Sequence, residues 1–310
     1  MTANAQSIIF HQYDVSPFSE KVRVVFGMKG LEWYACDQPV IMPKPELLAL
    51  TGAYRKIPVM QIGADIYCDS QIIIRELERR FPSPSLMVGG DQGLGYGVGM
   101  WTDRPLFLAV VAVLFGGDWV ADEAFVKDRE KLMGRPFDIA AMREAAPHAH
   151  EQLRAQFDWL DSQLADGRSF LMGDAPGLID ADAYYNIAFL RWGSAAGTKV
   201  LNHMPHLLAW EQRIKALGHG KRREISRDDA IAIAHAATSI TTAATDPGEP
   251  NGLKAGDRVA VSADDYGRDP VEGELVSSSA QHIAVRRHDA RAGDVVVHLP
   301  RAGFVVTRLG

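Results

Sequence analysis

A short hairpin pattern that runs into a helix start constrains the fold more than any other part of the sequence. Two apolar runs, residues 60–62 and 66–68, are separated by turn residues that include a glycine, the pattern of two antiparallel strands in a tight hairpin. Asp69 and Ser70 follow; both residue types cap helices, and the apolar residues over 73–81 then repeat at helical spacing. Because backbone N–H groups converge at a helix start, we expect a carboxylate to bind beside Ser70.

Pro58 stands where the first strand of this hairpin begins. Proline has no N–H for a sheet ladder, so it is expected at an edge or in a special backbone geometry. This leaves the backbone of Ile57 free to pair with an extended ligand. The pattern therefore predicts a peptide-binding edge.

The composition is that of an ordinary globular protein. With 310 residues, of which 47% are hydrophobic and 23% charged, the chain is long enough for two or three domains. The net charge of -6 argues against a nucleic-acid or anionic-membrane surface, because such surfaces select clustered Lys and Arg. We therefore expect no nucleic acid and no membrane as a partner.

The cysteines and the apolar segments indicate a cellular compartment. Cys36 and Cys68 are too few for a disulfide framework or a zinc site, so we expect reduced thiols. Residues 1–9 lack the basic segment and the long apolar core of a signal peptide. The apolar run at residues 106–115 is about half as long as a membrane span. These features predict a cytoplasmic protein.

The first part of the chain alternates strand and helix signals. Residues 7–10 have strand character, Ser16 before Pro17 is a helix start, and residues 31–39 indicate a second strand. A loop or short helix then leads to the hairpin described above. This order predicts a thioredoxin-like α/β domain over residues 1–85, with a parallel pair of strands extended by antiparallel ones.

The next segment is rich in glycine and precedes a long helical region. No lysine follows these glycines and no strand precedes them at the spacing of a nucleotide loop, so we interpret residues 86–99 as a flexible linker. Helical periodicity with Gly or Pro at most boundaries then predicts an all-helical bundle domain over residues 100–244. The expected helices cover residues 100–115, 121–133, 139–164, 180–192 and 205–217, with one more after Ser226.

The tail, residues 253–310, has a different pattern. Five short runs of β type, separated by Gly, Asp or Ser, predict a small all-β barrel of the SH3-like kind. Its Lys and Arg residues equal its Asp and Glu residues in number, so it offers no basic face for nucleic acid. We expect it to pack against its own chain or against the partner subunit of a dimer, tethered by residues 245–252.

Several motifs resemble the soluble glutathione transferases. The motifs similar to the N-terminal domain of that family are residues 16–23 (SPFSEKVR), 44–46 (KPE), 57–58 (IP) and 69–70 (DS), and residues 170–180 (FLMGDAPGLID) are similar to its turn into a central buried helix. The family usually caps that helix with Ser or Thr, where this chain has Gly177, a slightly weaker cap. The resemblance covers about the first 225 residues and leaves the tail unexplained.

This resemblance implies that Ser16 is the catalytic residue, as in serine-type transferases. Lowering the pKa of a thiol from about 8.5 to about 6.5 takes roughly 2.7 kcal/mol. A hydroxyl that hydrogen-bonds to a charged sulfur supplies about 1.5 to 3 kcal/mol, and a helix N-terminus adds roughly 0.3 to 1 kcal/mol. Tyr13 is the alternative donor because its phenol is more acidic. Helix capping by Ser16 and strand-end packing by Tyr13 are the structural alternatives.

The resemblance also implies a set of residues that bind glutathione. Asp69 would hold the ammonium group and Ser70 the carboxylate of the γ-glutamyl end, and Lys44 would contact the glycyl carboxylate. Phe18 and Ile57 would contribute backbone groups. The structural alternatives are simple capping for Asp69 and Ser70 and solvation for a loop lysine such as Lys44.

Two further groups of side chains have competing interpretations. Aromatic residues near the start of the helical half line an acceptor pocket or fill a core: Trp101, Phe107, Phe115 and Trp119. Paired histidines lack carboxylates or cysteines at ligand spacing, so no metal site is predicted at His148, His150, His203 and His206.

Together these features predict a glutathione S-transferase-like enzyme. It would use glutathione as co-substrate, activate its thiol and conjugate it to a small hydrophobic electrophile. The family is commonly dimeric, so the resemblance also implies a homodimer. The alternative is a non-catalytic binding or scaffold protein of the same fold, whose β tail mediates interactions.

Overall fold

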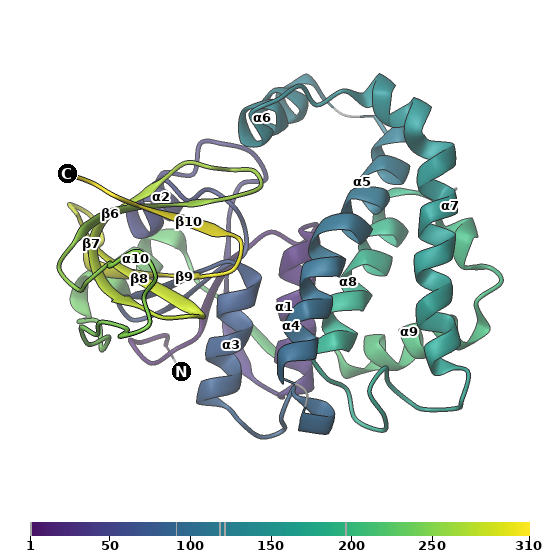
Figure 1. Cartoon of the computed structure of the whole chain (residues 1–310), viewed down its shortest axis with the longest axis horizontal. Coiled ribbons are helices and arrows are strands. Elements are labelled where there is room, and N and C mark those ends of the chain that lie inside the picture. Colours follow the sequence, from purple (N-terminus) through teal and green to yellow (C-terminus); the bar gives the residue numbers. More distant parts are fainter. Residues whose placement is uncertain (1, 91, 118, 121, 196) are drawn as a thin grey trace.

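The computed structural model describes residues 2–90, 92–117, 119–120, 122–195 and 197–310. Figure 1 shows the sheet and both chain ends on the left and most of the helices on the right. Within the described residues one sheet joins the beginning and the end of the chain, in the strand order β10-β6-β7-β8-β9-β4-β3-β1-β2-β5. The tail is therefore part of the same sheet as the N-terminal domain.

The N-terminal domain has the predicted thioredoxin-like arrangement. Strand β1 pairs in parallel with β2 and antiparallel with β3, and β3 pairs antiparallel with β4. Helices α1 and α3 pack against one sheet face together with the helical half, whereas α2 packs against the other face. The elements are β1 (Ile9–Gln12), α1 (Pro17–Met28), β2 (Glu32–Asp37), α2 (Pro45–Thr51), β3 (Val59–Ile62), β4 (Asp65–Cys68) and α3 (Ser70–Arg80).

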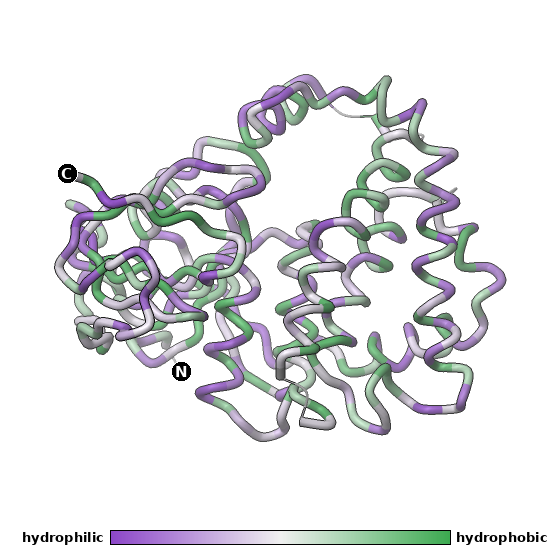
Figure 2. The backbone as a smooth tube through the Cα atoms, viewed as in Figure 1, coloured by the Kyte–Doolittle hydropathy of each residue, from purple (hydrophilic) through white to green (hydrophobic). Residues whose placement is uncertain are grey.

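The second part is helical, as predicted. Its elements are η1 (Val88–Gly90), α4 (Gln92–Trp101), the π-helical turn η2 (Thr102–Leu106), α5 (Phe107–Gly116), α6 (Glu123–Met133), α7 (Ile139–Leu164), α8 (Leu178–Gly193), η3 (Gly197–Leu201) and α9 (Pro205–Leu217). Helix α8 is buried along most of its length and forms the centre of the bundle. Helix α7 lies at the outer edge, where Figure 2 shows hydrophilic and hydrophobic residues alternating along it, as expected for a helix with one solvated face.

Most of the glycine-rich segment belongs to helix α4, which begins at Gln92, so the prediction of a flexible linker over residues 86–99 is corrected for residues 92–99. A Cβ atom added at Gly95 would lie 3.0 Å from Cδ2 of Leu178, and one added at Gly99 would lie 3.3 Å from Oδ2 of Asp182. The glycines therefore permit a close approach of α4 to α8, which outweighs their low helix propensity. The helical run Gly93–Gly116 is long and apolar enough to span a membrane by length and composition, but it packs against α7 and α8.

The close contacts of Gly177, at the start of α8, explain why this chain lacks the Ser or Thr that usually caps this helix. A Cβ atom at this position would lie 2.8 Å from the carbonyl oxygen of Leu86 and 2.9 Å from Cγ2 of Val88. The side chain of Asp180 instead accepts the Gly177 N–H at 2.9 Å and closes the helix end. Glycine is thus required by the close contact, and the expected weakening of the cap is offset by Asp180.

The chain returns to the sheet before residue 244, which corrects the prediction that residues 100–244 are all helical. Strand β5 (Lys221–Glu224) pairs in parallel with β2, and α10 (Arg227–Ala236) packs against α2 and β9. Strand β5 is exposed at the sheet edge and consists of charged residues only, so it has no apolar alternation by which a strand is recognised.

The tail forms five strands, in agreement with the predicted β runs. They are β6 (Arg258–Ala263), β7 (Val271–Ser278), β8 (His282–Asp289), β9 (Gly293–Pro300) and β10 (Phe304–Arg308), and each successive pair from β6 to β9 is antiparallel. Strand β10 pairs with β6, whereas no ladder joins β10 to β9 in the described part of the chain. Closure into an SH3-like barrel thus stays a prediction.

The tail docks on its own chain through strand pairing and a shared core. Strand β9 runs parallel to β4, with Asp65, Ile66 and Tyr67 of β4 opposite Val296, Val297 and His298 of β9. His298 Nε2 lies 3.0 Å from Asp65 Oδ1 at the junction. One apolar cluster contains residues from both parts, among them Leu50, Val59, Ile66, Val285, Val295 and Leu299. The N-terminal domain therefore buries one sheet face against the tail.

Candidate active site

A cavity of about 390 Å³ lies between the N-terminal domain, the helical half and the tail. Every site residue predicted from the sequence lines it: Ser16, Phe18, Lys44, Ile57, Asp69 and Ser70. The alternative donor Tyr13 lines it as well. The fold therefore brings together residues from four separate segments.

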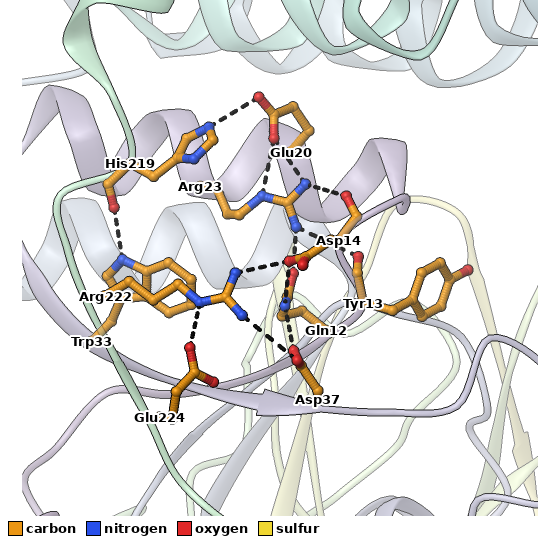
Figure 3. A network of polar contacts seen from close by, with 10 residues as sticks. All are labelled: Gln12, Tyr13, Asp14, Glu20, Arg23, Trp33, Asp37, His219, Arg222 and Glu224. Carbon is orange, nitrogen blue, oxygen red and sulfur yellow. Dashed lines mark hydrogen bonds and ion pairs between the residues drawn. The ribbon is translucent and has the colours of Figure 1, made fainter. Parts of the chain in front are cut away.

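A buried arginine holds the loop between β1 and α1 (Figure 3). Arg23 donates to the carbonyl oxygens of Tyr13 at 3.5 Å and Asp14 at 2.8 Å, and Glu20 accepts from its guanidinium at 2.8 Å. Arg222 of β5 pairs with the Asp14 carboxylate at 2.8 Å. These contacts fix the backbone that leads into the first helix, and the returning strand β5 supports it from outside.

Ser16 is the N-cap of α1, and its Oγ accepts the N–H of Ser19 at 3.2 Å. This bond uses an acceptor site of the hydroxyl and leaves its hydrogen for another partner. Capping and hydrogen bonding to a ligand are therefore compatible. The predicted structural alternative and the predicted catalytic role use different parts of one group.

Tyr13 lies under the ammonium group of Lys44, whose Nζ is 5.5 Å from the ring centroid. Burial raises the pKa of the Tyr13 phenol above 10, while Arg129 and the Ser16 hydroxyl act in the opposite direction. A raised pKa makes the phenol a weaker donor than an exposed tyrosine. Burial thus weakens Tyr13 as a donor relative to an exposed tyrosine, and both Ser16 and Tyr13 lie at the cavity as candidate donors.

Asp69 and Ser70 begin helix α3, as predicted. Asp69 Oδ1 accepts the N–H of Gln71 at 2.9 Å, so Asp69 caps the helix. Its backbone has φ +96°, a value that non-glycine residues rarely adopt and that is often retained at functional sites. Burial raises the pKa of the Asp69 carboxyl, and Lys56 counters part of that rise. A ligand ammonium group would stabilise the same carboxylate.

The peptide between Ile57 and Pro58 is cis. Strand β3 begins only at Val59, and the backbone of Ile57 makes no hydrogen bond within the described residues. Both polar groups of this residue remain available beside the cavity. Strand β3 itself lies between β4 and β1, so the prediction of a sheet edge is corrected. Only the backbone of Ile57, just before the strand, stays available to an extended ligand.

Lys44 is buried rather than solvated. Its Nζ lies 3.4 Å from the carbonyl oxygen of Arg55. Burial lowers the pKa of Lys44 to about 8, helped by the nearby guanidinium groups of Arg129 and Arg55, while Asp128 opposes the change. A buried ammonium group without a paired carboxylate is costly, so a ligand carboxylate would be bound favourably here.

Phe18 has a role beyond the predicted backbone contact. Its ring centroid lies 4.8 Å from that of Phe107 in α5 and 5.2 Å from that of Tyr185 in α8. The side chain therefore joins the N-terminal domain to the helical half at the cavity.

The helical wall of the cavity is strongly aromatic. Three of the four aromatic residues singled out in the sequence line it, namely Phe107, Phe115 and Trp119. Trp101 does not, because it packs against Trp159 and donates to Gln156 Oε1 at 2.8 Å. This wall suits an apolar or aromatic group.

Some lining residues were not predicted from the sequence. Arg55 and Lys56 directly precede the Ile57–Pro58 pair, so their place in the sequence could have indicated that they lie at the site. Arg129 comes from α6, and no comparable signal marks it. The tail adds Tyr266 and Phe304 to the wall. No local pattern reports a contact between segments so far apart in the sequence.

Neither cysteine lines the cavity, although Cys68 directly precedes Asp69. Both are buried, and burial raises the pKa of Cys36 to about 12 and that of Cys68 well above its ordinary value. Neither thiol is activated as a nucleophile. No cluster of three or more His, Cys, Asp or Glu side chains suited to a metal ion occurs within the described residues.

Two family comparisons match separate parts of the chain. Residues 10–85 match the family described as glutathione S-transferase, N-terminal domain. Residues 116–222 match a domain family of unknown function, DUF7962. The first match covers the segment that contains all six predicted site residues.

Individual relatives extend this similarity. A GST-like protein from Pseudomonas syringae, whose crystal structure is known, is 36% identical, with a TM-score of 0.83 over 98% of this chain and 100% of that one. A probable glutathione S-transferase of rice (Oryza sativa), GSTU1, is 26% identical over 68% of this chain and 86% of its own length. A glutathione S-transferase from Rhodospirillum rubrum shares the fold at 20% identity, with a TM-score of 0.53 over 67% of this chain and 88% of that one.

Proposed function

Because the chain belongs to the soluble glutathione S-transferase family, we propose that it binds glutathione in this cavity and conjugates it to a small hydrophobic electrophile. The observation that carries the proposal is the convergence of Ser16, Lys44, Ile57, Asp69 and Ser70 on a cavity with one aromatic wall. Polar groups for a tripeptide and apolar groups for an acceptor thus line one space.

Each charged group of glutathione has a matching partner. Asp69 binds the ammonium group and the N-terminus of α3 at Ser70 binds the γ-glutamyl carboxylate. Lys44 binds the glycyl carboxylate, and the free backbone groups of Ile57 pair with the cysteinyl residue. Phe18 adds its backbone at the first turn of α1. The tripeptide then extends from α3 to Lys44, with its sulfur near α1.

Ser16 stabilises the sulfur as a thiolate. The thiol proton passes to solvent, and the Ser16 hydroxyl donates a hydrogen bond to the charged sulfur, worth about 1.5 to 3 kcal/mol. The thiolate attacks the electrophilic carbon and a C–S bond forms. With an aryl halide the halide ion leaves. With an activated alkene the neighbouring carbon takes up a proton.

We also propose the larger organisation of the protein. We propose three domains, at residues 1–85, 100–244 and 253–310. Within the second range, β5 and α10 belong with the sheet and not with the helical bundle, because β5 pairs with β2 and α10 packs against α2 and β9. We propose that the tail is a small SH3-like barrel, and the pairing of β10 with β6 supports this proposal. A cytoplasmic homodimer is the proposed assembly, and light scattering of the purified protein measures its mass.

Retention on immobilised glutathione, combined with conjugation of an aryl halide such as chlorodinitrobenzene, tests the proposed function. We expect elution by free glutathione and a rate above that of the uncatalysed reaction. Binding without turnover over a wide panel of electrophiles would instead favour the non-catalytic scaffold. Absence of binding would contradict both.

The affinity for S-methylglutathione, which has no thiol, should fall as the pH rises above about 8. The pKa of Lys44 in the free protein is about 8, so its ammonium form is lost above that pH. A bound carboxylate favours the charged form, so binding near pH 8 takes up a proton. Calorimetry in buffers with different ionisation enthalpies measures both effects. The Lys44→Met variant should bind S-methylglutathione more weakly at pH 7, and its affinity should show no fall near pH 8. If the fall near pH 8 persists in this variant, Lys44 does not belong to the site.

A further inference from the structure

The first part of the loop between β6 and β7, residues 264–267, connects the tail to the helical half beside the cavity. Asp264 Oδ1 accepts from Arg104 Nη2 at 2.6 Å. The N–H of Gly267 donates to the carbonyl oxygen of Leu132, near the end of α6, at 2.7 Å. This loop is therefore anchored at two separate points of the helical half.

The same loop is anchored to the N-terminal domain through Lys56. Lys56 Nζ lies 3.2 Å from Asp265 Oδ1 and 3.1 Å from the carbonyl oxygen of Tyr266. Three rings surround this ammonium group, with centroids 4.8 Å away for Tyr266, 5.6 Å for Tyr54 and 5.7 Å for Phe304. Ion pairing and cation–π contact act together, which fixes the backbone of Tyr266 more firmly than either alone.

The backbone conformation and the close neighbours of position 267 favour glycine there. Gly267 has φ +61°, and a Cβ atom there would lie 3.0 Å from Cδ1 of Leu132 and 3.1 Å from Cδ of Lys56. The loop is thus packed closely onto both neighbours. A close fit of this kind holds Tyr266 in one position at the cavity wall.

We propose that Tyr266 is a specificity-determining residue, which contacts the acceptor from the tail side of the cavity and favours aromatic over small aliphatic electrophiles. Tyr266 is half-buried and lines the cavity together with Phe304 of the tail and Phe107 and Phe115 of the helical half. This inference rests on the proposed function, because it assigns the acceptor part of the same cavity.

The preference follows from the two aromatic walls. Because rings of both the helical half and the tail line the cavity, we expect an aryl group on the glutathione sulfur to contact both, which a methyl group is too small to do. Aromatic contacts contribute beyond their buried area, and the loss of one typically weakens binding about three- to tenfold. The tail would therefore act on acceptor selectivity.

Binding of two glutathione conjugates by the full-length chain tests this role without requiring turnover. S-(2,4-dinitrophenyl)glutathione and S-methylglutathione share the tripeptide and differ only in the acceptor group. Titration calorimetry should show that Tyr266→Ala lowers the preference for the dinitrophenyl conjugate about three- to tenfold, with the Kd for S-methylglutathione within about twofold of wild type. Tyr266→Phe should keep the wild-type preference.

A matched control separates this effect from a general disturbance of the tail. Arg286 is exposed on β8, pairs with Glu274 and does not line the cavity, so Arg286→Ala should change neither Kd. An unchanged aryl preference in Tyr266→Ala, or an equal loss for both conjugates, would overturn the role of Tyr266. If wild type binds neither conjugate, the glutathione site itself is wrong and the inference falls with it.

Discussion

Replacing Ser16 with alanine should lower kcat/KM for the conjugation of chlorodinitrobenzene by about ten- to hundredfold. The lost hydrogen bond to a charged sulfur is worth about 1.5 to 3 kcal/mol, and about 1.4 kcal/mol corresponds to a tenfold change in rate. Because Ser16 Oγ also accepts the Ser19 N–H, the free energy of unfolding should fall by about 0.5 to 2 kcal/mol as well. Steady-state kinetics and urea unfolding measure the two effects separately.

Another helix cap provides the matched control. Ser226 is the N-cap of α10, where its Oγ accepts the N–H of Asp229 at 3.1 Å, and it does not line the cavity. Ser226→Ala should cost similar stability without slowing conjugation. If Tyr13→Phe causes the large loss in rate and Ser16→Ala does not, the thiolate donor is Tyr13.

Removal of the tail after Ala244 should destabilise the remaining chain severely. The cut exposes side chains such as Leu50, Val59 and Ile66, which are fully buried and belong to the core shared with the tail. Exposing three such residues costs on the order of 5 kcal/mol, comparable to the whole unfolding free energy of an ordinary domain, about 5 to 15 kcal/mol. We expect aggregation, or a melting temperature lower by at least about 10 °C, in circular dichroism.

A cut chain that keeps both pieces is the control for this truncation. A protease site placed within residues 247–250, outside the elements of the sheet, should leave the two fragments associated on size-exclusion chromatography, with the melting temperature close to that of the intact chain. A truncated protein that melts like the full-length chain would show that the tail is an independent module.

The N-terminal site was predictable because its signals are local. A cap residue before Pro17, a proline at the start of β3 and a cap pair before α3 each determine a short piece of backbone. The thioredoxin-like order of elements then places those pieces at one side of the sheet. The full electrostatic environment of Lys44 was not predictable, since Arg129 and Asp128, whose charges act on its pKa, come from α6, far along the chain.

Contacts between distant segments account for the remaining differences. The glycines of α4 indicate a linker when taken alone, and only the approach of α8 shows why Gly95 and Gly99 are helical. Strand β5 carries no apolar residue, so only its pairing with β2 identifies it. The tail contributes Tyr266 to the cavity because β9 adds to the edge of β4, a pairing that no alternation of residues in either strand specifies.

The pH titration of the thiol of bound glutathione, followed by the ultraviolet absorbance of the thiolate, tests most directly whether Ser16 stabilises the thiolate. A free thiol has a pKa of about 8.5. We expect the bound thiol to titrate about two pH units lower in wild type. Ser16→Ala should raise its pKa by most of this difference, whereas Ser226→Ala should leave the pKa unchanged. A bound thiol that titrates like free glutathione, or an equally lowered pKa in Ser16→Ala, would contradict this role of Ser16.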